Sequence, residues 1–144
     1  MTGTLFGNEP DRDEHDRAIV DAYQAAGRTL DDLPYTAEFE RLMASLQEHV
    51  PDAEHRATFH RLHNLRKAGK LPRLGRADSS PPRLDYDHEQ QLVELVAAET
   101  GSLGQRDRLP YTDGFDRVAA TFNIESGLSL SHHDLWRVIA KLAK

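Results

Sequence analysis

Leu33-Pro34-Tyr35-Thr36, followed by Phe39 and Arg41, occurs a second time in this chain as Leu109-Pro110-Tyr111-Thr112, followed by Phe115 and Arg117. The similarity extends on both sides of this motif. Upstream, His15, Ile19, Val20 and Asp21 align with His88, Leu92, Val93 and Glu94. Downstream, His55, Phe59, Leu62, Leu65 and Lys67 align with His132, Trp136, Ile139, Leu142 and Lys144. Such self-similarity is typical of a repeated structural unit, which here has roughly 60 to 70 residues and only a thin core of its own.

The repeated motif predicts the start of a helix. A residue before proline is disfavoured in the helical region, and threonine is a preferred N-cap, so a helix is expected directly after each copy. In a structural interpretation, the leucine and tyrosine of the motif pack on that helix. In a functional interpretation, Tyr35 and Tyr111 are equivalent exposed contacts for a partner. Repetition by itself is compatible with both.

Apolar spacing predicts further helices along the chain. We expect helices over 13–26, 37–48 and 53–69, then one that ends at Gly101, one capped by Thr112 and one capped by Ser131. No stretch has the period-two alternation of a strand. The predicted fold is therefore all-α, a tandem repeat of two three-helix units. Its expected parts are a flexible tail over 1–12, a first unit over 13–76, a linker over 77–83 and a second unit over 84–144.

Composition excludes several classes of protein. The chain has 144 residues and no cysteine, which excludes disulfides, thiolate catalysis and cysteine-based zinc sites. No apolar run approaches the ~20 residues that a membrane helix needs. The first nine residues lack the basic start and apolar core of a signal peptide. We therefore expect a cytoplasmic protein with no membrane partner.

Charge is distributed unevenly along the chain. The net charge is −6, which by itself opposes unspecific attraction to nucleic acid. Residues 1–32 contain eight acids and three bases, and residues 84–144 contain ten acids and six bases. Residues 33–76 have the opposite balance, with five acids and eight bases. One basic segment therefore lies in an otherwise acidic protein.

The third expected helix and the residues after it carry most of this positive charge. Three helices, a short turn between the last two and a basic third helix make residues 13–76 resemble a helix-turn-helix unit, and the continuation over 67–76 resembles the start of the wing in winged-helix proteins. The resemblance implies that the third helix lies in the major groove of DNA and that the residues after it contact phosphate. The candidate nucleic-acid-binding residues are Arg56, His60, Arg61, His63, Asn64, Arg66, Lys67, Lys70, Arg73 and Arg76.

Two alternatives to DNA binding stay open. Cationic residues are favoured at a helix C-terminus in any case, so the basic helix is also compatible with a solvated surface. The second unit ends at Lys144, where the first unit continues into its basic segment, and the loop over 123–130 is long for a helix-turn-helix turn. These features favour a protein-protein interaction adaptor.

The sequence offers little for catalysis or metal binding. There are eight histidines, but His55, His60 and His63 do not share one helical face, so we expect no metal site and no cofactor. No nucleophile elbow, zinc-protease motif or phosphate-binding loop is present. The sequence therefore predicts a non-enzymatic binding module, either a DNA-binding protein or transcriptional regulator that uses its basic third helix, or an adaptor for another protein.

Overall fold

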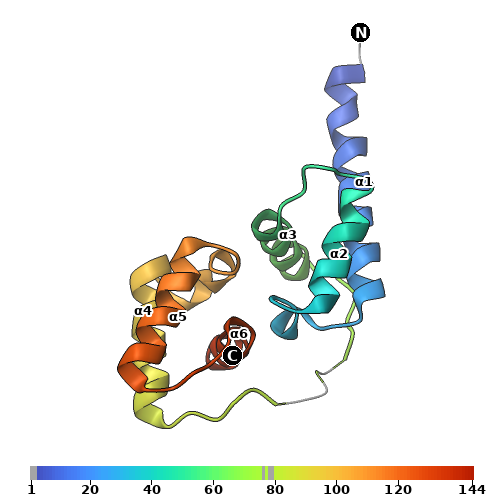
Figure 1. Ribbon diagram of the computed structural model, residues 1–144. Helices are drawn as coiled ribbons and strands as arrows, with labels where there is room; N and C mark the ends of the chain where they lie inside the picture. Colours follow the sequence, from blue (N-terminus) through green and yellow to red (C-terminus); the bar gives the residue numbers. More distant parts are fainter. Residues whose placement is uncertain (1–2, 76, 78–79) are drawn as a thin grey trace.

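The computed structural model describes residues 3–75, 77 and 80–144, with side chains from residue 12 onward, and all regular elements in these ranges are helices (Figure 1). No strand occurs in these ranges, so the all-α prediction is confirmed. The elements in chain order are α1 (Gly3–Ala26), η1 (Leu30–Asp32), α2 (Ala37–Gln47), α3 (His55–Lys67), α4 (Tyr86–Thr100), η2 (Leu103–Arg108), α5 (Asp113–Ser126) and α6 (His132–Leu142). The labels η1 and η2 denote 3-10 helices.

Local sequence signals set most of the helix ends. Thr36 accepts a hydrogen bond from Phe39 N–H at the start of α2, and Thr112 accepts one from Phe115 N–H at the start of α5. Ser131 caps α6 in the same way. These three predicted caps are confirmed, because a cap depends only on residues within one turn of the helix.

Other ends differ from the sequence predictions. The helix expected to begin at residue 13 begins at Gly3 and includes most of the segment expected as a tail. Glycine and Pro10 in that segment disfavour a helix, but helix propensity is only a weak guide, and α1 continues through these residues. Figure 1 shows this end of α1 projecting beyond the other helices. The helix expected over 53–69 is shorter and runs over His55–Lys67, and α4 is capped by Asp85.

The third helix of each half lies at the centre of the molecule (Figure 1). We call residues 12–75 the first half and residues 84–144 the second half. Within the halves α1 packs on α2, and α4 packs on α5. Across the halves α3 contacts η2 and α6 contacts η1. The third helices therefore connect the two halves.

Both halves contribute to one continuous hydrophobic core. The rings of Phe59 and Trp136, which occupy aligned positions in the repeat, meet edge to face with centroids 5.1 Å apart. Trp136 Nε1–H donates to the carbonyl of Leu30 at 3.4 Å. The predicted core positions Leu33, Leu109, Phe39, Phe115, Phe59 and Trp136 are all buried. Sharing one core compensates for the small size of each half.

Candidate functional site

The two tyrosines of the repeated motif have an unusual backbone conformation. Tyr35 has φ of 63° and Tyr111 has φ of 66°. This left-handed region is costly for a residue with a bulky side chain, and such residues gather at sites where the surrounding structure over-determines them. Each tyrosine directly precedes the threonine that caps the following helix, so both strained positions lie where a half enters its second helix.

The tyrosines hold each other in place across the halves. Tyr35 N–H donates to the hydroxyl oxygen of Tyr111 at 2.5 Å, and Tyr111 N–H donates to the hydroxyl oxygen of Tyr35 at 2.6 Å. Their rings stack with centroids 4.3 Å apart. Burial raises the pKa of Tyr35 to about 12 and raises that of Tyr111 as well, so both stay neutral. The two residues expected as exposed partner contacts are thus half-buried and contact each other.

A histidine–carboxylate pair flanks the tyrosine stack on each side. His55 Nε2 lies 3.0 Å from Glu40, and the His55 ring lies 4.9 Å from that of Tyr111. On the other side, His132 Nε2 lies 2.9 Å from Asp116, and its ring lies 5.1 Å from that of Tyr35. His55 and His132 are aligned in the repeat, as are Glu40 and Asp116. We call this contact between the halves, formed by the two tyrosines and the two histidine–carboxylate pairs, the junction. Each half contributes the same set of contacts to it.

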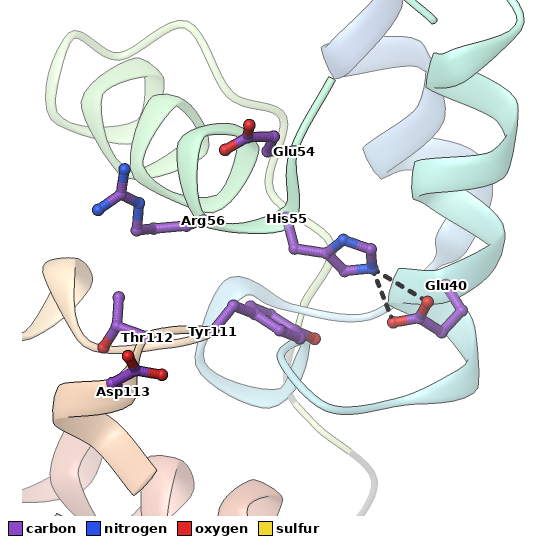
Figure 2. Close-up of a pocket in the computed structure, with 7 residues that line it drawn as sticks. All are labelled: Glu40, Glu54, His55, Arg56, Tyr111, Thr112 and Asp113. Carbon is purple, nitrogen blue, oxygen red and sulfur yellow. Dashed lines mark hydrogen bonds and ion pairs between the residues drawn. The ribbon is translucent and has the colours of Figure 1, made fainter. Parts of the chain in front are cut away.

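One side of this junction is an open depression of about 680 Å³, which we call the junction depression. Figure 2 shows His55 pointing toward Glu40, while Arg56 extends in the opposite direction. The lining residues are Glu40, Glu54, His55, Arg56, Tyr111, Thr112 and Asp113. Three carboxylates and one guanidinium make this a strongly polar surface. Its openness suits contact with a charged segment of a partner better than enclosure of a small molecule.

Several basic residues of α3 are held by acids from other elements. Arg61 forms two hydrogen bonds with Asp16 of α1, at 2.8 and 2.6 Å. This contact with Arg61 lowers the pKa of Asp16. Arg66 lies 3.2 Å from Asp31 of η1. These two arginines, expected at a DNA surface, instead tie α3 to the rest of the first half.

His60 and His63 connect α3 to the second half. His60 Nδ1 lies 2.6 Å from Asp107 Oδ2 of η2, and Asp107 is buried. The His63 side chain is also buried, against the rings of Phe59 and Trp136. Burial, reinforced by the nearby positive charge of Arg66, lowers the pKa of His63 to about 3, so this ring is neutral at neutral pH. Both histidines therefore have contacts inside the protein.

The remaining predicted DNA contacts are more accessible. Arg56, Lys67, Lys70 and Arg73 are exposed, and none forms an ion pair with another residue of the described ranges. We call these four residues the exposed cations. Asn64 is half-buried, and its side-chain nitrogen lies 3.4 Å from His60 Nε2. Arg76 lies outside the described residues. Of the ten predicted residues, the structure thus places four as free surface charges.

The acids that hold the basic residues of α3 were not predicted from the sequence. Asp16, Asp31 and Asp107 are each distant from their partners along the chain, so no local pattern pairs them. The histidine–carboxylate pairs did have a signal, because His55 and His132 align in the repeat. The alignment predicted that His55 and His132 occupy equivalent positions, but it did not predict that each lies close to a carboxylate.

No group of three histidine or acidic side chains is placed to hold a metal ion among the described residues. In the same ranges, each helix is too short or too polar to traverse a lipid bilayer. No family model, curated protein or solved structure matches this chain.

Proposed function

We propose that this chain is a non-enzymatic module that binds double-stranded DNA through phosphate contacts. The observation that carries the proposal is a difference among the basic residues of α3 and of the segment that follows it. Arg61 and Arg66 form ion pairs with acids, whereas the four exposed cations form no ion pair in the described part of the chain. Cations without an internal partner are available to replace the counterions of a phosphate backbone.

The placement of α3 favours phosphate contact over base reading. Arg56, His60, Asn64 and Lys67 follow one another at turn spacing along one face of α3. His60 and Asn64, in the middle of that face, contact Asp107 and each other. Only the two ends of the face, at Arg56 and Lys67, carry free charge. A surface of this kind positions a duplex and carries little sequence information.

We also propose that the two halves are a tandem repeat of one three-helix unit. The reciprocal tyrosine hydrogen bonds and the two histidine–carboxylate pairs support this, because each joins or occupies aligned positions of the two copies. In this arrangement the four exposed cations all belong to the first copy. DNA contact is then a property of the first copy, and the second copy completes the core.

Salt dependence tests the proposal. Four phosphate contacts give a slope of about −3.6 for log K against log salt, which weakens binding about 150-fold between ~50 and ~200 mM salt. Replacement of Arg56, Lys67, Lys70 and Arg73 by glutamine should abolish binding to a short duplex of random sequence, measured by fluorescence anisotropy.

The matched control removes the same charge elsewhere. Arg12, Arg17, Arg83 and Lys141 are exposed and lie outside the set of exposed cations. Replacing these four by glutamine gives the same change in net charge, and we expect this variant to keep most of the affinity and the slope. Equal loss in both variants would show that only net charge matters. Absence of binding by the unmodified protein at low salt would refute the proposal.

A protein partner with a basic segment is a second candidate, and the junction depression is the observation that favours it. Glu54 and Asp113 are exposed there and have no ion pair within the described ranges. If the depression binds such a segment, a labelled oligolysine peptide should bind the protein, and Glu54→Gln with Asp113→Asn should weaken that binding. Equal binding by the double variant would remove this candidate.

A further inference from the structure

His60 lies in the middle of the α3 face to which the proposed function assigns DNA contact. Its Nδ1 atom lies 2.6 Å from Oδ2 of Asp107 in η2. The Asp107 side chain is 4% exposed, whereas the His60 side chain is 43% exposed. On the same face, Arg56 lies one turn before His60 and Lys67 lies two turns after it. The histidine therefore stands between a buried carboxylate and the surface.

The charge of the His60–Asp107 pair depends on the second ring nitrogen of the histidine. An ionised carboxylate only accepts hydrogen bonds, so Nδ1–H donates to Asp107 and the neutral ring keeps a lone pair on Nε2. Nε2 lies 3.4 Å from the side-chain nitrogen of Asn64, whose amide group can donate to this atom or accept from it. With a neutral ring the pair carries the negative charge of Asp107, which repels a phosphate. A proton on Nε2 cancels that charge.

The groups around His60 leave it as the residue of this face that changes charge near neutral pH. Histidine is the side chain that gains a proton in this range. His63, on the buried side of α3, has a pKa of about 3 and stays neutral. α1 also packs against α3, but its Asp16 is bonded to Arg61. The other charged groups around His60 are Asp107 and Arg106 of η2, and Arg56, Arg61 and Lys67 of α3.

We propose that DNA binding is coupled to protonation of His60, so that the centre of the face takes up one proton when a phosphate backbone lies against it. The inference rests on the proposed function and deepens it, because it states how that surface is regulated. A nearby negative charge favours the protonated form of a histidine. Coupling between two ligands is reciprocal, so protonation strengthens DNA binding by the factor by which DNA favours protonation. The ligand class is a phosphodiester backbone, and the regulator is the proton.

The salt slope of duplex binding by the full chain, measured at about pH 8 and at about pH 6, tests this inference. For the unmodified protein, the slope should be larger in magnitude by about 0.9 at the lower pH, the value of one additional neutralised phosphate. His60→Gln should have the same slope at both pH values, because glutamine still donates to Asp107 but takes up no proton. His49→Gln is the matched control and should keep the difference, since His49 is exposed and forms no ion pair with another described residue.

His60→Lys places a fixed positive charge beside Asp107. This variant should bind at about pH 8 with the slope that the unmodified protein has at about pH 6, and its slope should not change with pH. Thermal melts at both pH values should first confirm that each variant is folded. The inference is overturned if the unmodified protein has the same slope at both pH values, or if either His60 variant keeps the difference. Absence of binding by the unmodified protein at both pH values refutes the proposed function itself, so the two failures are distinguished.

Discussion

Replacement of Tyr111 by phenylalanine should destabilise the protein out of proportion to the single oxygen removed. Its hydroxyl oxygen accepts the hydrogen bond from Tyr35 N–H, and Tyr35 holds a strained left-handed conformation at the junction. Without that oxygen, the Tyr35 N–H lies in a half-buried place with no acceptor. An unsatisfied group of this kind costs about 1–3 kcal/mol. The ring stack remains, so the expected loss of unfolding free energy lies in this range.

Urea unfolding, followed by Trp136 fluorescence and by circular dichroism, measures this loss. The matched control is Tyr86→Phe, because Tyr86 is 70% exposed and a surface change of this kind usually stays within about 0.5 kcal/mol. Tyr35→Phe should behave like Tyr111→Phe, since the contact is reciprocal.

The double variant tests whether the two contacts act as one unit. Both hydrogen bonds depend on the same stacked pair, so their losses should not add, and the coupling should be about 0.5–3 kcal/mol. A Tyr111→Phe variant that unfolds at the same urea concentration as Tyr86→Phe would refute the reasoning. Coupling near zero would show that the two hydrogen bonds form independently.

Two further predictions concern the shared core. Trp136→Ala should cost about 3–5 kcal/mol, because the indole is fully buried against Phe59 and bonded to Leu30; an unchanged circular-dichroism melt would contradict this. Burial lowers the pKa of His63 in the folded protein to about 3, from its ordinary value of 6.5, so the unfolded chain binds more protons between these values. Its contribution to stability is full above pH 6.5 and is lost as the pH falls toward about 3. His63→Asn should therefore flatten the decline of the urea midpoint between pH 7 and pH 4, whereas replacing exposed His49 in the same way should not.

Features that depend on neighbouring residues were predictable from the sequence. The caps at Thr36, Thr112 and Ser131 follow from residue types within one helical turn. The buried positions follow from apolar spacing, which is a property of each helix by itself. The start of α1 was the exception, because Gly3, Gly7 and Pro10 argue locally against a helix that nevertheless continues through them.

The candidate site was only partly predictable. Spacing along α3 identified a basic helix, but an acid elsewhere in the chain decides whether each base is free. Arg61 is neutralised by Asp16, and His60 is held by Asp107, at separations of 45 and 47 residues. Lys67 has no such partner among the described residues and stays exposed. Residue type therefore predicted the charge of the helix but not the charge available to a ligand.

The sequence by itself determined an all-helical chain, the caps of its helices, its core positions and the equivalence of Tyr35 and Tyr111, because each of these depends on local geometry or on repetition. Only the tertiary structure decided that the two tyrosines face each other and that α3 contacts the opposite half. Those outcomes depend on which surfaces the two halves bury together. Burial depends on contacts between segments that are distant in the sequence. A single contact of this kind can make a residue that was predicted to bind a ligand unavailable at the surface.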